Sequence, residues 1–138
     1  MANTTFNGPV TSQNGFIAGH QVIASNAIDA TATATAAQVA TGYITSTSAA
    51  PTTITLPTGT LLGAALGATR GTTLDLYIDN TAGASTVTIA VATDGILSSA
   101  ANDASPFALS TVAAGATGVG RFTIMFSSAT AYVFTRTA

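Results

Sequence analysis

Two stretches in the middle of the chain alternate apolar and polar residues with a period of two. The apolar members are Leu74, Leu76 and Ile78 in the first stretch and Val87, Ile89 and Val91 in the second. That period is typical of half-buried β-strands, because successive side chains point to opposite faces of a sheet. The connection between them contains Asn80 and Gly83, which tolerate the positive φ of turns. We therefore predict a β-hairpin over residues 72–92 and an all-β fold.

Further short strands are expected at residues 42–47, 53–57 and 107–112, with a loop over 96–106. The C-terminal residues form a second predicted hairpin, 119–127 with 131–136. Its inward side chains are Phe122, Ile124, Phe126, Tyr132 and Phe134. At 138 residues the chain is long enough for one domain. Seven to nine short strands separated by turns indicate a single antiparallel β-sandwich or barrel, jelly-roll-like or otherwise.

Two other segments are less regular. Residues 25–41 alternate Ala and Thr; the β-branched Thr favours a strand, although Ala favours a helix. Residues 58–70 are the one plausible short helix, with Thr60 as its N-cap. Its apolar stripe is Leu61, Leu62 and Leu66. Glycines at a spacing of four indicate room for close backbone packing, and they are Gly63, Gly67 and Gly71.

The first 24 residues are predicted to form an N-terminal arm that precedes a β domain over residues 25–138. Two turn signals, Asn7-Gly8-Pro9 and Asn14-Gly15, separate isolated apolar residues there. Such an arm either packs on its own domain or pairs with the sheet edge of a neighbour. Its candidate contact residues are Phe6, Val10, Phe16 and Ile17.

Charged residues are rare. They make up 6% of the chain, with neither Lys nor Glu, whereas ordinary soluble domains carry about 25%. A net charge of −2 cannot hold a polyanion, so we expect no nucleic-acid partner. Little like-charge repulsion opposes association, which favours a subunit of a larger assembly. No apolar run reaches the roughly 18 residues of a membrane span, and the N-terminus lacks a signal-peptide pattern, so we expect neither a membrane partner nor secretion.

The sequence offers few groups for catalysis. His20 is the one histidine, and no Gly-x-Ser-x-Gly elbow accompanies it. Asp75 and Asp79 lie four residues apart on one strand, which separates them by roughly 13 Å and prevents them from sharing a proton. We expect Asp75 to be solvated or paired with an Arg, and Asp79 to bond the backbone of the following turn. The chain is therefore predicted not to be an enzyme, with no metal and no cofactor.

Threonine motifs raise a different class of function. Thr-x-Thr occurs at residues 31–35 and 53–55, as on flat ice-binding faces. Such a face needs strands stacked at a fixed repeat, and the sequence has no internal period that carries the motif. Ordinary solvent-facing strand threonines are the favoured interpretation.

Several short motifs resemble those of tailed-phage structural proteins. The segment 6–10, Phe-Asn-Gly-Pro-Val, followed by Asn14-Gly15-Phe16, resembles the N-terminus of small phage head proteins. Residues 54–59 (Ile-Thr-Leu-Pro-Thr-Gly), 79–89 and 113–115 (Ala-Ala-Gly), with the closing aromatic hairpin, are similar to β-rich capsid decoration proteins, also called cement proteins.

This resemblance implies a homotrimer on the outer face of an icosahedral capsid, with the major capsid protein as partner. It implies synthesis in the host cytoplasm and a final location in the virion, and it transfers no catalytic residues. The arm residues are then candidates for capsid or intersubunit contact. Alternatives are a tail or head-fibre protein, or, in another class, a threonine-rich bacterial surface or ice-binding protein.

Overall fold

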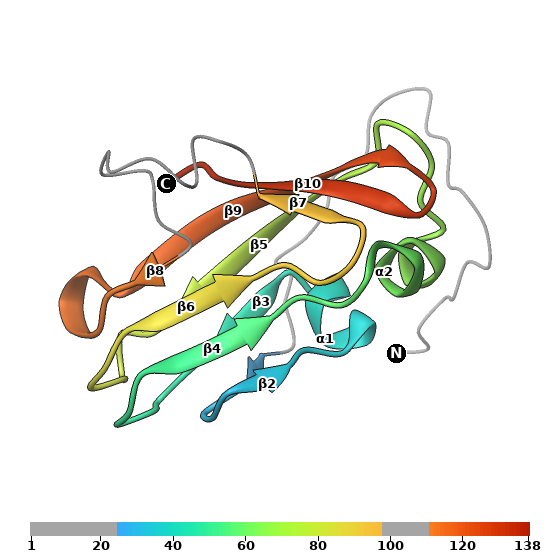
Figure 1. The fold of residues 1–138 in the computed structure, drawn as a ribbon. Coiled ribbons are helices and arrows are strands. Elements are labelled where there is room, and N and C mark those ends of the chain that lie inside the picture. Colours follow the sequence, from blue (N-terminus) through green and yellow to red (C-terminus); the bar gives the residue numbers. More distant parts are fainter. Residues whose placement is uncertain (1–24, 98–110) are drawn as a thin grey trace, which may run out of the picture.

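The computed structural model describes residues 25–97 and 111–138, and strands dominate it (Figure 1). One sheet has six strands in the order β1-β3-β5-β9-β10-β7, and the other has four in the order β2-β4-β6-β8. The six-stranded sheet consists of β1 (Asn26–Ala27), β3 (Tyr43–Thr45), β5 (Thr73–Asp79), β9 (Val119–Ser128), β10 (Ala131–Arg136) and β7 (Gly95–Leu97). The four-stranded sheet consists of β2 (Ala32–Thr33), β4 (Thr52–Thr55), β6 (Val87–Ala90) and β8 (Thr111–Val112). The fold is therefore mostly β, as predicted.

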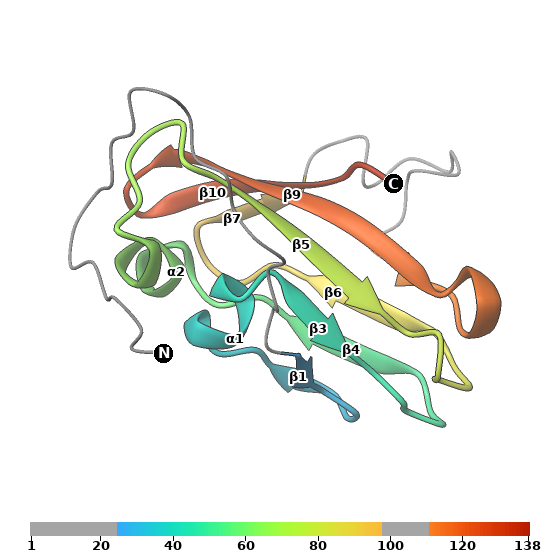
Figure 2. The ribbon, with the colours of Figure 1, turned by 180° about the vertical axis from the view of Figure 1, so that it is seen from behind.

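The first part of the described chain passes back and forth between the two sheets. From β1 to β6 successive strands alternate between sheets, and each lies parallel to the strand two places earlier. Figures 1 and 2 show the two sheets from opposite sides, with the four-stranded sheet in front in the first view. Antiparallel neighbours follow, since β9 pairs with β5, β10 with β9, and β8 with β6. The expectation of antiparallel sheets is therefore wrong, because both sheets are mixed.

The predicted central hairpin is also wrong in its pairing. Both strands exist, but β5 and β6 belong to different sheets. The connection over residues 80–86 crosses between the sheets, and its anchor is Asn80, which is fully buried. The Asn80 Nδ2 donates to three carbonyl oxygens, those of Ser85, Val112 and Ala113, at 2.8, 3.2 and 3.0 Å. A period of two identifies the inward face of a strand but not its partner.

Side chains from both sheets form one hydrophobic core. It contains Ile44, Leu76 and Ile78 of the six-stranded sheet and Ile54 and Ile89 of the four-stranded sheet. The predicted C-terminal hairpin is confirmed, and its five predicted inward side chains are all buried. Two of its aromatic contacts are a stacked Phe122–Phe134 pair, with ring centroids 4.9 Å apart, and a tilted Phe126–Tyr132 pair at 5.8 Å.

The predicted helix is confirmed as α2 (Gly59–Leu66), but its N-cap is Thr58 and not Thr60. The Thr58 side chain accepts a hydrogen bond from the Leu61 amide at 3.3 Å. Gly67 ends the helix in the left-handed conformation, with φ of 58°. A Cβ on Gly63 would overlap with the carbonyl oxygen of Ala129, so this glycine allows α2 to approach the β9–β10 connection. The predicted close packing thus applies to Gly63.

A second helix, α1 (Ala36–Ala40), replaces much of the strand expected over residues 25–41. A capping box starts it, in which the Thr35 side chain accepts from the Gln38 amide and the Gln38 side chain accepts from the Thr35 amide. At most one short helix was expected, so this helix is a correction. Strand β7 likewise lies in a stretch expected to be a loop, and a 3₁₀ turn, η2 (Gly115–Thr117), precedes β9.

Candidate interaction site

The arm predicted to make contacts lies outside the described residues. This applies to the candidate contact residues Phe6, Val10, Phe16 and Ile17 and to His20. A candidate site therefore has to come from the two sheets and their ends.

The outer face of the six-stranded sheet brings polar and aromatic side chains into register. Tyr43, Tyr77 and Arg121 lie side by side on β3, β5 and β9. The Arg121 guanidinium carbon lies 5.8 Å from the centre of the Tyr77 ring. This row could not be predicted from the sequence, because it depends on the parallel pairing of β3 with β5.

Both carboxylates of β5 are held by hydrogen bonds on this face. Asp75 accepts from Arg121 Nη2 at 2.6 Å and from Thr123 Oγ1 at 2.9 Å, and the guanidinium is the main reason that its pKa is lowered. Asp79 accepts from the hydroxyl and amide of Thr81, which lower the pKa of Asp79, and from Tyr43 Oη at 2.6 Å. The bond to Asp79 raises the pKa of Tyr43 in turn. The two expectations for Asp75 and Asp79, an Arg partner and a backbone bond in the turn, are confirmed.

This network uses its carboxylates for hydrogen bonds within the chain and does not join them into a ligand cluster. In residues 25–97 and 111–138, no group of three or more His, Cys, Asp or Glu side chains is placed to hold a metal ion. No helix in the same ranges is long and apolar enough to cross a membrane. On this face Asp75, Asp79 and Arg121 are therefore paired within the chain.

An apolar stripe crosses the same face on three adjacent strands. Met125 of β9 is in register with Val133 of β10, and Val133 is in register with Ile96 of β7. We call these three residues the apolar stripe. Met125 is 49% exposed and Ile96 is 58% exposed, so two of its three members present large hydrophobic surface.

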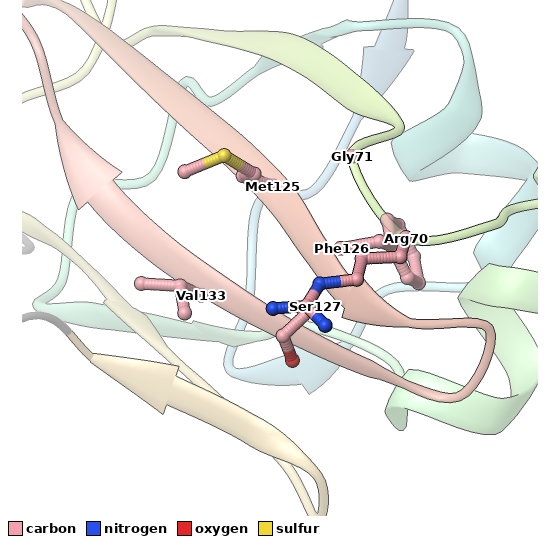
Figure 3. Close-up of a pocket in the computed structure, with 6 residues that line it drawn as sticks. All are labelled: Arg70, Gly71, Met125, Phe126, Ser127 and Val133. Carbon is pink, nitrogen blue, oxygen red and sulfur yellow. The ribbon is translucent and has the colours of Figure 1, made fainter.

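A pocket of about 240 Å³ lies at one end of the stripe, between Met125, Val133 and Arg70 (Figure 3). Arg70 belongs to a turn in which the Thr72 amide donates to the Thr69 carbonyl at 3.0 Å. The Gly71 amide fixes this turn to β9 by donating to the Phe126 carbonyl at 2.8 Å. Gly71 has φ of 89°, which glycine adopts without strain. The pocket therefore combines an apolar floor with a guanidinium whose turn is held by the backbone.

A second hollow, of about 430 Å³, lies where β2 enters α1 and β4 enters α2. Its lining is free of charged side chains: Thr33, Ala34, Thr35, Ala36, Pro57, Thr58, Leu61 and Ala92. Leu61 is 60% exposed there and presents an aliphatic side chain to this hollow. This groove is suited to an apolar side chain of a neighbour.

The outer face of the four-stranded sheet carries stacked threonines. Thr53, Thr88 and Thr111 form one row across β4, β6 and β8, and Thr33 and Thr55 stack in the next row across β2 and β4. Single threonines therefore stack in a two-row pattern across neighbouring strands, although only β4 carries both rows and the sequence spacing between the members is uneven. A search of the sequence for a fixed period could not find it.

No family model, no curated protein and no solved structure matches this chain.

Proposed function

We propose that the chain is a structural virion protein, a capsid decoration (cement) protein that binds the outer surface of an icosahedral phage head as a homotrimer. Its partner is the major capsid protein, and its place of action is the virion after synthesis in the host cytoplasm. We also infer that the two mixed sheets form a β-sandwich. Separate edge strands, β1 and β7 in one sheet and β2 and β8 in the other, favour a sandwich over a closed barrel.

The observation that carries the proposal is a surface with few charges and several exposed hydrophobic side chains. Five large hydrophobic side chains of the described residues are exposed: Leu61, Tyr77, Ile96, Val119 and Met125. Within the described ranges the structure contains a single ion pair, Arg121 with Asp75. Apolar surface with few charges is typical of chains that bind other proteins in an assembly.

The physical role follows from mass action. A subunit that binds only the mature shell stabilises that shell, because separation of the capsomers must first break its contacts. Three modest contacts on one rigid trimer combine through effective concentration, so no single contact has to be tight. Since few charges are available, shell binding should depend little on salt.

The experiment is to add the purified full-length protein to expanded shells that lack it and to measure copies bound and shell rupture temperature. We expect hundreds of copies per particle and a higher rupture temperature. Deletion of residues 2–18 tests the arm: unchanged occupancy would discard the arm as an anchor and leave the decoration proposal intact. A few copies located at the tail would instead support the runner-up, a tail or head-fibre protein, and no binding to particles would refute both.

The stacked threonines favour one second candidate, ice binding. Neighbouring strands repeat at about 4.8 Å and alternate residues at about 6.7 Å, so the rows present hydroxyls on a regular two-dimensional grid. The test is inhibition of ice recrystallisation by the full-length protein. The candidate predicts inhibition that Thr88→Tyr abolishes and that Thr123→Tyr, on the opposite sheet, leaves intact. Absence of inhibition by the unsubstituted protein would eliminate the candidate.

A further inference from the structure

The two ends of the apolar stripe carry opposite charges, and neither charge is paired within the described residues. Arg70 lies at the β9 end, beside Met125 and Val133. Of the other two arginines, Arg121 is paired with Asp75 and Arg136 donates to backbone carbonyls. In residues 25–97 and 111–138 the Arg70 guanidinium makes neither a hydrogen bond nor an ion pair.

Asp94 lies at the opposite end, two residues before Ile96 of the stripe. Its backbone carbonyl accepts from the Tyr132 amide at 3.0 Å, which fixes the corner between β6 and β7 to β10. Asp94 has φ of 64°, a conformation that Asp and Asn adopt more readily than most residues. Its carboxylate has no partner within the described parts of the chain, and the residue is exposed. Backbone hydrogen bonds therefore fix the chain at or beside both residues, and neither side-chain charge is paired within the described residues.

An arrangement of cation, apolar stripe and anion is complementary to itself after a rotation of 180°. When two copies face each other with their stripes reversed, Arg70 of each copy meets Asp94 of the other. The Met125 end of each stripe then faces the Ile96 end of its partner, with Val133 near the axis. This is the pattern of an isologous interface, in which residue i contacts residue j and j contacts i.

We infer that the outer face of the six-stranded sheet pairs with the same face of a second copy about a twofold axis that passes near Val133. Charge complementarity selects a second copy as the occupant, because one surface supplies a cation and an anion that are both without a partner in residues 25–97 and 111–138. This contact goes beyond the trimer proposed above. If trimers form, it joins a subunit of one trimer to a subunit of the next.

The absence of cysteine allows a direct test in the full-length protein. Val133→Cys places a single thiol near the proposed axis, so a short bismaleimide should link two copies into a covalent dimer on a denaturing gel. Thr88→Cys is the matched control, since it is also a half-buried strand residue but lies on the outer face of the four-stranded sheet. We expect at least tenfold less dimer from residue 88. Equal yields from the two positions would overturn the inference.

Charge exchange tests the pairing of the ends. In the Val133→Cys background, Arg70→Asp and Asp94→Arg should each lower the dimer yield at least tenfold, and the double variant should restore it. Ala84→Asp, exposed in the connection at the other end of β5, should leave the yield unchanged. If a reversal impairs folding, Arg70→Gln and Asp94→Asn provide neutral substitutions, and Asn retains the tolerance for positive φ.

Single variants that crosslink normally, or a double variant that fails to recover, would refute the pairing. These measurements use free protein without shells. A negative result therefore leaves the decoration proposal standing, and a protein that pairs but binds no shell would refute only the decoration proposal.

Discussion

Asn80 is the residue whose loss should most weaken the joint between the two sheets. Its side chain is fully buried, and its amide group is shared by the carbonyl oxygens of Ser85, Val112 and Ala113. The two N–H groups of the amide are shared among these three acceptors, so Asn80→Ala removes about two full hydrogen bonds. It also leaves buried carbonyl oxygens without a donor. At about 1 to 1.5 kcal/mol for each bond, the free energy of unfolding should fall by roughly 2 to 3 kcal/mol. That is a large part of the roughly 5 to 15 kcal/mol that a typical domain has.

Urea unfolding followed by far-ultraviolet circular dichroism measures this loss. Asn26→Ala is the matched control, because it truncates the same side chain where Nδ2 makes one half-buried bond, to Thr41 Oγ1 at 2.8 Å. The control should lose about 1 kcal/mol or less. If Asn80→Ala also loses less than about 1 kcal/mol, the connection does not depend on this amide and the explanation is wrong.

The variant Asn80→Asp sharpens the test through pH. A carboxylate there would face three carbonyl oxygens, so the folded state should bind a proton more tightly than the unfolded chain and raise the pKa of the new group. A raised pKa in the folded state means that stability is present at low pH and is lost as pH rises through that value. The free energy of unfolding of Asn80→Asp should therefore be low at pH 7 and increase as the pH is lowered towards 5. The unsubstituted protein should not gain in that window, since the pKa values of Asp75 and Asp79 are lowered and these groups weaken the fold only when pH falls further.

Three further variants test other parts of the fold. Thr58→Ala should cost about 1 kcal/mol of unfolding free energy by removing the α2 cap, whereas Thr60→Ala should cost little; equal urea midpoints would refute the assignment. Gly63→Ala should cost about 2 kcal/mol despite the better helix propensity of Ala, because its Cβ would overlap with the Ala129 carbonyl, and a stabilised variant would contradict that contact. Burial raises the pKa of Tyr132 to about 12, so the free energy of unfolding should fall as pH rises from 10 through 12. Tyr132→Phe should not show this fall when unfolding is measured at alkaline pH. The same pH profile in both proteins would refute the role of Tyr132.

The alternation of side chains predicted the inward faces well. Leu76, Ile78, Val87 and Ile89 are buried as the period requires, and so are the aromatic residues of the C-terminal hairpin. Alternation is a property of a single strand, so the face that each side chain occupies can be predicted without knowing which strand is the neighbour. Pairing depends on the connection, and nothing in residues 80–86 reveals that Asn80 turns inward to bond three carbonyls. The parallel pairing of strands β1 to β6 therefore could not be predicted from the sequence.

One missed element did leave a local signal. Thr35 and Gln38 have the spacing of a capping box, and that box begins α1 inside an Ala/Thr run that was predicted as a strand. The prediction weighed the alternation of β-branched Thr against the helix propensity of Ala and did not consider this spacing. The apolar stripe had no comparable signal. Met125, Val133 and Ile96 become neighbours only through the register of β9, β10 and β7, and Ile96 lies in a stretch that was expected to be a loop.

The scarcity of charge changes what each remaining charge can do. A surface with many Lys and Glu side chains offers many weak pairings, and one more ion pair adds little specificity. In this chain the described residues leave Arg70 without a partner at one end of an apolar stripe and Asp94 without one at the other. Apolar contact is not directional, so the stripe alone would permit two copies to slide or to pair in either orientation. The two end charges remove that freedom, because only the reversed orientation brings opposite signs together and the alternative brings like charges into contact. High salt should therefore weaken the preference for the reversed orientation more than it weakens the affinity between the two copies. The Val133→Cys crosslink reports the affinity, because residue 133 lies near the axis, and crosslinks from less central positions report the orientation. Measuring both yields across a salt titration would give the difference.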